Sequence, residues 1–146
     1  MRSQFGVVAL SVALAGGVIA ADDAVRTLAR GSQSGVKKPD RVVAKNQEEW
    51  TALWKRHLGE AQTTEAPKVD WSKEMVLAAF MGTRNTGGYA LQITGAKEQE
   101  GKLTVQVEAK VPKPGGFVTQ SITSPFHMVA VPKSTLPVAW VVGEAK

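Results

Sequence analysis

The chain has 146 residues, a formal net charge of +5 and no cysteine. This length fits one domain, and the lack of cysteine excludes disulfides, thiol nucleophiles and most structural zinc sites. The lysines are scattered and aromatic residues do not alternate with them, which indicates a mildly basic solvated surface and not a nucleic-acid platform. We therefore expect no cofactor, no metal site and no nucleic-acid partner.

The first 21 residues have the layout of a secretory signal peptide. Arg2 supplies a positive charge, an apolar run extends from Phe5 to Leu14, and small residues stand at Ala20 and Ala21. We expect cleavage after one of these alanines, a periplasmic or secreted protein, and no stable membrane insertion afterwards. The alternative is a retained anchor, which would rest on an uncharged stretch at the short end of the spanning range, interrupted by a glycine pair.

Residues 22–41 are expected to form an N-terminal strand and a polar turn, ahead of a domain at 42–146. Apolar residues alternate over Val25–Leu28, and a flexible polar turn follows at Gly31–Gly35. Another short strand is predicted over 42–44. No internal repeat or low-complexity tract interrupts the rest of the chain.

A helix is predicted to begin after Asn46. The Asn46 side chain can cap free backbone N–H groups, Glu49 stands three residues further on as in a capping box, and Gly59 ends the helix. Apolar residues follow at helical spacing, and we expect this stripe to pack on a sheet instead of stacking on a ligand: Trp50, Leu53, Trp54 and Leu58. His57 lies beside the stripe and is interpreted as a boundary residue without a metal-binding partner.

The remaining chain is rich in strands. Residues 75–81 are apolar on both faces, which predicts a central strand, and the later strands alternate between apolar and polar residues. Those strands are expected over 89–94, 103–111, 119–131 (bent at Pro125) and 138–142. Connections are too short for parallel crossovers, so the predicted class is α+β, mainly β: an antiparallel sheet or sandwich-like barrel with one packed amphipathic helix.

Catalytic signatures are missing from the sequence. No nucleophile elbow, metalloprotease helix motif or phosphate loop is present, and the two histidines, His57 and His127, have no acidic partner near them in sequence. Two carboxylates could still meet in space, which leaves a small hydrolase or ligand-binding protein as an alternative. The preferred prediction is a protein that is not an enzyme.

Two glycine-rich loops join the predicted strands, at 82–89 and 112–118. In an antiparallel meander both loops emerge at one end of the sheet, with the 98–102 turn at the other, so they would form one rim that carries an arginine beside exposed aromatics. Gly87→Val should cost stability if the backbone at Gly87 is left-handed. The predicted protein-binding residues are Arg84, Asn85, Thr86, Gly87, Gly88, Tyr89, Pro114, Gly115, Gly116 and Phe117.

The same loops carry a family resemblance. The G-x-R-x-T-G-G-Y motif at 82–89 and the P-x-P-G motif at 112–115, in this order and spacing, resemble the C-terminal domain of the PrcB family. The W-x-x-L-W helix and the V-D-W segment at 69–71 resemble that family's lead-in, so the resemblance extends over roughly 42–140. The lipid-anchored members carry a cysteine after the signal, which is absent here.

The resemblance implies a non-catalytic accessory role, because the family takes its name from a subunit of a secreted protease complex. The expected function is therefore an exported protein-binding module, an accessory or stabilising subunit of a secreted protease. An alternative is a loop-inserting protease inhibitor, since Asn85–Tyr89 is similar to a loop of chagasin-like inhibitors that plugs protease clefts.

Overall fold

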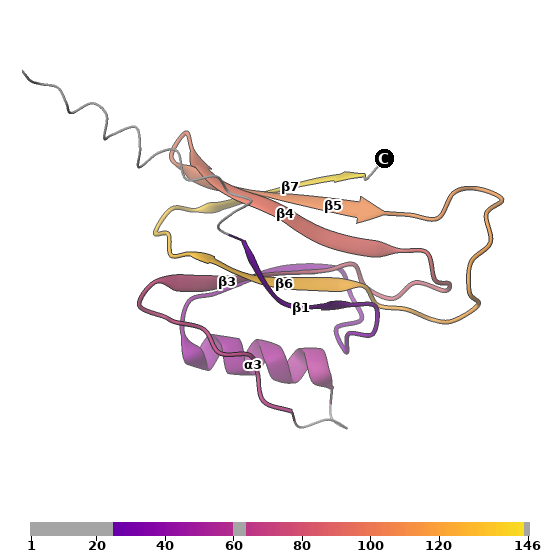
Figure 1. Ribbon diagram of the computed structural model, residues 1–146, viewed down its shortest axis with the longest axis horizontal. Helices are drawn as coiled ribbons and strands as arrows, with labels where there is room; N and C mark the ends of the chain where they lie inside the picture. The colour runs from indigo at the N-terminus through magenta and orange to yellow at the C-terminus, as the bar shows by residue number, and fades with distance from the viewer. Residues whose placement is uncertain (1–24, 60–63, 145–146) are drawn as a thin grey trace, which may run out of the picture.

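The computed structural model describes residues 25–59 and 64–144, which form three layers (Figure 1). A helix covers one face of a four-stranded sheet, and a three-stranded sheet covers the other face. The elements are β1 (Arg26–Gly31), β2 (Asp40–Ala44), α3 (Gln47–Leu58), β3 (Glu74–Phe80), β4 (Ala90–Gln99), β5 (Lys102–Lys110), β6 (Phe126–Pro132) and β7 (Val138–Glu144). The predicted mainly-β fold with one packed helix is confirmed, and the predicted signal peptide lies outside the described residues.

The strand order differs from the predicted meander. The first sheet has the order β1-β6-β3-β2 with antiparallel neighbours, and the second has the order β4-β5-β7. The chain crosses between sheets after β3, after β5 and after β6, so consecutive strands are often not neighbours. Because β6 lies in the other sheet, β7 returns beside β5 in the same direction, and these two strands are parallel. The sheets form a sandwich and not a closed barrel.

The first sheet is buried on both faces, as the apolar run at 75–81 predicts. Met75, Leu77 and Ala79 of β3 face the second sheet, whereas Val76 and Ala78 belong to the core beneath α3. Successive strand side chains point to opposite faces, so an uninterrupted apolar segment supplies two cores at once. Along its two edges β3 pairs with β6 and β2, so it is also a central strand of the sheet.

Helix α3 begins and ends at the predicted residues. The Asn46 side chain accepts a hydrogen bond from the Glu49 backbone N–H at 2.8 Å, and the Gly59 N–H donates to the Lys55 carbonyl. Glu49 reaches back to the N–H of Lys45 at 2.8 Å, one residue earlier than a standard capping box requires. The helix places Trp50 fully in the core, confirming the packing role predicted for the stripe.

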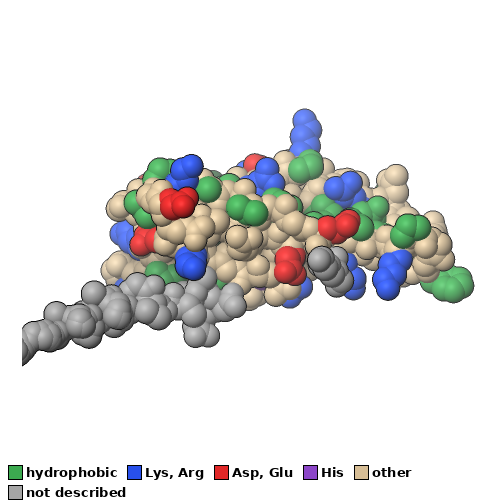
Figure 2. All heavy atoms as spheres, turned by 90° about the horizontal axis from the view of Figure 1, so that it is seen from above, with side chains coloured by type: hydrophobic (Ala, Val, Ile, Leu, Met, Phe, Trp, Pro, Cys, Tyr) green, Lys and Arg blue, Asp and Glu red, His purple; other side chains and the backbone are tan. Residues whose placement is uncertain are grey.

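The β4–β5 hairpin forms most of the second sheet. A two-residue turn at Glu100 and Gly101, both with positive φ, joins its strands at the predicted place. The pairing shifts between Ile93 and Gly95, which marks a β-bulge in β4. Seen from above, this side of the molecule carries scattered basic side chains with acidic ones among them, in keeping with the predicted solvated surface (Figure 2).

The long strand predicted over 119–131 is much shorter in the structure. β6 begins at Phe126, and before it only Thr123 and Ser124 form isolated bridges, to Arg84 and Gln33. Proline at 125 lacks the N–H that a continuing ladder needs, so the chain before it can cross from one sheet to the other. Among residues 25–59 and 64–144, no helix is long and apolar enough to cross a membrane.

Candidate functional site

Both glycine-rich loops lie at one end of the sandwich and are held together by their backbones. Arg84 and Thr123 exchange backbone hydrogen bonds of 2.7 and 2.8 Å, and the Gly87 N–H donates to the Thr119 carbonyl at 2.9 Å. The Thr123 hydroxyl adds a hydrogen bond to the Thr86 carbonyl. We call residues 82–89 and 111–123 together the rim. The loops are adjacent as predicted, although both join one sheet to the other, which the meander did not anticipate.

Glycine is required in the first loop for two different reasons. Gly82 and Gly88 have φ values of 85° and 91°, in the region that favours glycine. Gly87 does not have a positive φ, so the left-handed backbone on which the Gly87→Val prediction depends is not found there. At Gly87 the constraint is space, because a Cβ would meet the Thr119 side chain. The close approach of the two loops therefore explains this glycine.

Replacing Gly88 with alanine should lower the free energy of unfolding by about 1–3 kcal/mol. The residue would be strained at positive φ, and its Cβ would lie 3.0 Å from the Val118 side chain and 3.1 Å from Pro112. Gly115→Ala is the matched control, since Gly115 has a similar φ of 78° but no atom within 4 Å of a Cβ. Urea unfolding of both variants measures the difference; equal losses would show that the two loops do not pack at Gly88.

The second loop projects apolar side chains into solvent. Phe117 is fully exposed (106%), and Ile122 and Val111 are exposed to 65% and 42%. Pro114 and Gly115 form the turn before Phe117, with the Gly116 N–H bonded to the Lys113 carbonyl. An apolar side chain also projects at the far right end in Figure 2, where Figure 1 places the loop after β5. Phe117 was predicted from the sequence, whereas Ile122 was not, because Ile122 falls in the strand predicted over 119–131.

Arg84 connects the exposed rim to the interior. Its guanidinium lies over the Tyr89 ring, 5.3 Å from the ring centroid, which is within cation–π range. Its Nε is buried and has no hydrogen-bond partner among the described residues. A buried donor without a partner is uncommon in folded proteins. Among the predicted binding residues, Arg84 is therefore the one whose structure points most directly to a ligand.

Of the other predicted binding residues of the first loop, Thr86 and Gly87 help to hold the loop in place. Gly87 is buried, and the Thr86 hydroxyl donates to the Gly87 carbonyl at 3.0 Å, whereas Asn85 and Gly88 are exposed. The segment that is similar to the chagasin-like loop is therefore tied down against Thr119. The projecting part of the rim is the second loop, around Phe117.

The two histidines are buried and occupied by structural contacts. The His127 Nδ1 accepts a hydrogen bond of 2.8 Å from the Ile93 N–H, and its Nε2 lies 2.9 Å from the Thr27 hydroxyl. The His57 Nδ1 lies 3.0 Å from the Ser34 hydroxyl. Burial lowers the pKa of both rings. In the described part of the chain, no group of three or more acidic, histidine or cysteine side chains could hold a metal ion.

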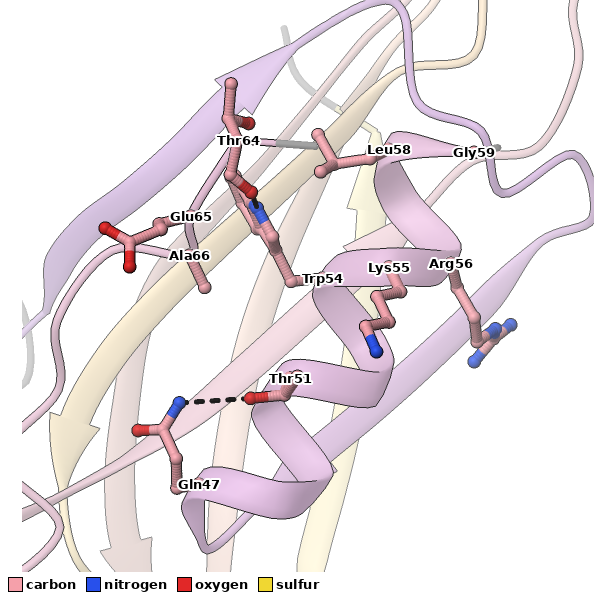
Figure 3. A pocket seen from close by; sticks show the side chains of 10 residues that line it. All are labelled: Gln47, Thr51, Trp54, Lys55, Arg56, Leu58, Gly59, Thr64, Glu65 and Ala66. Atoms are coloured by element: carbon pink, nitrogen blue, oxygen red, sulfur yellow. Dashed lines mark hydrogen bonds between the residues drawn. The ribbon is translucent and has the colours of Figure 1, made fainter. Parts of the chain in front are cut away.

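Another hollow in the surface lies along α3, and none of its lining residues belongs to the rim (Figure 3). Its volume is about 750 Å³, and two pairs of its lining residues are joined by hydrogen bonds: Trp54 Nε1 donates to the Thr64 carbonyl at 3.0 Å and Gln47 to the Thr51 hydroxyl at 3.1 Å. The segment that joins its two sides, 60–63, lies outside the described residues. This hollow therefore carries no functional assignment.

Residues 75–132 match a family model described as PrcB C-terminal. The match confirms the family resemblance predicted from the sequence, and it includes the motifs at 82–89 and 112–115. The matched range is shorter than the predicted extent of 42–140 and leaves out α3 and the segment 69–71. Comparison with the curated proteins gave no match, and neither did comparison with the solved structures.

Proposed function

We propose that the chain, whose residues 75–132 match the PrcB C-terminal family, is an exported non-catalytic module that binds another protein through the rim. The observation that carries the proposal is the fully exposed Phe117 on a loop whose base is fixed by backbone hydrogen bonds. An apolar aromatic side chain held out in water on a fixed support is typical of a binding hot spot.

The proposed nature of the partner is based on the family. A subunit of a secreted protease complex gives the family its name, so the partner we propose is an exported protease to which this module is an accessory. Export rests on the predicted signal peptide at 1–21, with the domain at 42–146 following it. Both remain predictions, as does the periplasmic or secreted location.

The buried histidines support the non-catalytic part of the proposal. A general base must reach the proton that it abstracts, but the His127 ring is about 98% buried, since its exposed fraction is 2%, and both ring nitrogens have partners within 2.9 Å. A hydrolase that used His127 would first have to break these contacts. This arrangement favours binding over the hydrolase alternative.

Replacing both Phe117 and Ile122 with serine should sharply reduce partner recovery without unfolding the protein. Immobilised wild-type protein is incubated with the exported proteins of the producing cells, and bound proteins are quantified by mass spectrometry. Because Phe117 and Ile122 are exposed to 106% and 65%, the melting temperature should stay within a few degrees of wild type. A hot-spot loss of about 2 kcal/mol or more corresponds to recovery that falls some thirtyfold.

Val141→Ser is the matched control, because Val141 is also exposed (45%) but lies on β7 outside the rim. Equal recovery by wild type, control and double variant would contradict the proposal. If an exported protease is recovered, its activity with and without this protein distinguishes the roles: unchanged or prolonged activity supports an accessory subunit, whereas inhibition supports the inhibitor alternative.

A further inference from the structure

A second cleft lies between the two sheets at the end that carries the rim. Its volume is about 200 Å³, and most of its walls are apolar: Pro39, Ala79, Phe80, Met81, Leu91, Val107, Ala109, Val111 and Val142. A water molecule takes up about 30 Å³ of liquid volume, and pockets for drug-sized ligands begin near 300 Å³. The space therefore suits a single large apolar side chain.

Two arginines complete the lining, Arg41 of β2 and Arg84 of the rim, and none of the lining residues is acidic. Within residues 25–59 and 64–144, the ion pairs shorter than 4.0 Å involve two other arginines, Arg26 and Arg56. The positive charge at the cleft is therefore not neutralised by an ion pair in the described part of the chain. An apolar cleft bordered by unneutralised guanidinium groups is complementary to an apolar group that carries an anion.

The buried Nε of Arg84 indicates which of the two arginines would contact the anion. It has no hydrogen-bond partner among the described residues, and a buried unsatisfied donor destabilises the folded protein. A movement of the Arg84 side chain that brings this N–H to a ligand oxygen in the cleft would remove that penalty. Guanidinium donors match the two oxygens of a carboxylate, so a carboxylate is the anion that the site fits best.

We infer that the cleft binds the C-terminal residue of the partner protein, with its apolar side chain between the sheets and its terminal carboxylate on Arg84. In a C-terminal residue the apolar group and the carboxylate are joined through one carbon, which fits a cleft that holds one side chain beside an arginine. The inference rests on the proposed function, because Arg84 and Val111 belong to both the cleft and the rim.

The test uses the ¹⁵N-labelled protein and the peptide acetyl-Gly-Ser-Gly-Leu with a free C-terminal carboxylate, followed by NMR. Saturable shifts are expected for the Arg84 Nε–H and for the backbone amides of Leu91 and Val107. The C-terminally amidated peptide should bind about tenfold to a hundredfold more weakly, as expected for the loss of a hydrogen bond to a charged group. Equal binding of the two peptides would overturn the role of the carboxylate.

Variants distinguish the contribution of Arg84 to peptide binding from that of the apolar cleft. Arg84→Gln should weaken binding of the free-carboxylate peptide by about tenfold or more, whereas Arg56→Gln, an exposed arginine outside the cleft, should leave it unchanged. Ala109→Leu, which fills the cleft, should abolish binding, and Val107→Met is a second filling variant if the first melts early. Binding of free 4-methylpentanoate but not of the peptide would assign the cleft to a small acid and overturn the inference.

The rim and the cleft can fail independently. Capture of the same partner by wild-type and cleft-filled protein, together with absence of peptide binding, would overturn the C-terminal residue as the ligand and leave the rim proposal intact. Peptide binding that persists in the Phe117→Ser, Ile122→Ser protein, with no partner recovered by any version, would support the cleft and contradict the proposed function.

Discussion

Acidification from pH 7 to pH 4.5 should destabilise the protein, and His127 should account for up to about 3 kcal/mol of that loss. Burial, with a smaller contribution from the positive charge of Arg30, lowers the pKa of His127 to about 4. Its Nδ1 must stay unprotonated to accept the hydrogen bond from the Ile93 N–H. Because Ile93 lies in the second sheet and His127 in the first, this bond joins the two layers.

The direction of the effect follows from where the proton binds. Above about pH 6.5 the ring is neutral in both the folded and the unfolded chain, and its contribution is fully present. As the pH falls from 6.5 towards 4, the His127 ring binds a proton in the unfolded chain but not in the folded protein, so the free energy of unfolding falls. Below about pH 4 the folded protein is protonated as well, and this contribution stops changing.

Urea unfolding of wild type and His127→Asn between pH 7 and pH 4.5 isolates the effect. The asparagine side-chain oxygen can accept from the Ile93 N–H but does not titrate, so the variant should show a flatter pH profile. His57, whose pKa burial also lowers, is present in both proteins and cancels in the difference. The hydrogen bond from Arg26 lowers the pKa of Glu74. The contribution of Glu74 to stability is therefore lost in more acidic solution than the contribution of His127. Parallel profiles would contradict the role of His127.

The elements that were predicted correctly depend on local patterns. The Asn46 cap, the Gly59 end of α3 and the two-residue turn at Glu100 and Gly101 are set by residues within a few positions of one another. The burial of β3 on both faces is also visible in its uninterrupted apolar run. These features need no knowledge of which strands pair.

The features that were missed depend on contacts between distant segments. Nothing in the local sequence shows that β6 lies between β1 and β3, and so the parallel β5–β7 pair was not predicted. The cleft needs Arg41 and Val142, which are far apart in sequence and meet only through the sandwich. The requirement for glycine at position 87 is a further example. It arises because a Cβ there would meet the Thr119 side chain, and no local pattern predicts this contact.

Replacing Gly82 with alanine should cost about 2–4 kcal/mol of unfolding free energy, the sum of a positive-φ penalty and a steric clash. Gly82 has a φ of 85°, and a Cβ there would lie 2.8 Å from both the backbone nitrogen and the Cδ of Pro39. The next residue, Thr83, donates its N–H to the Lys37 carbonyl at 3.0 Å, so relief of the clash would pull the rim away from the segment before β2.

Gly101→Ala is the control for backbone strain alone, because Gly101 has a φ of 76° and no atom within 4 Å of a Cβ. Chemical unfolding of the two variants should therefore give a loss at Gly82 that exceeds the loss at Gly101 by about 1–3 kcal/mol. Equal losses would mean that the contact with Pro39 is loose. Since Pro39 and Arg84 both line the cleft, the Gly82 variant should also bind the free-carboxylate peptide more weakly. The Gly101 variant has its change at the distant hairpin turn and should bind the peptide as wild type does.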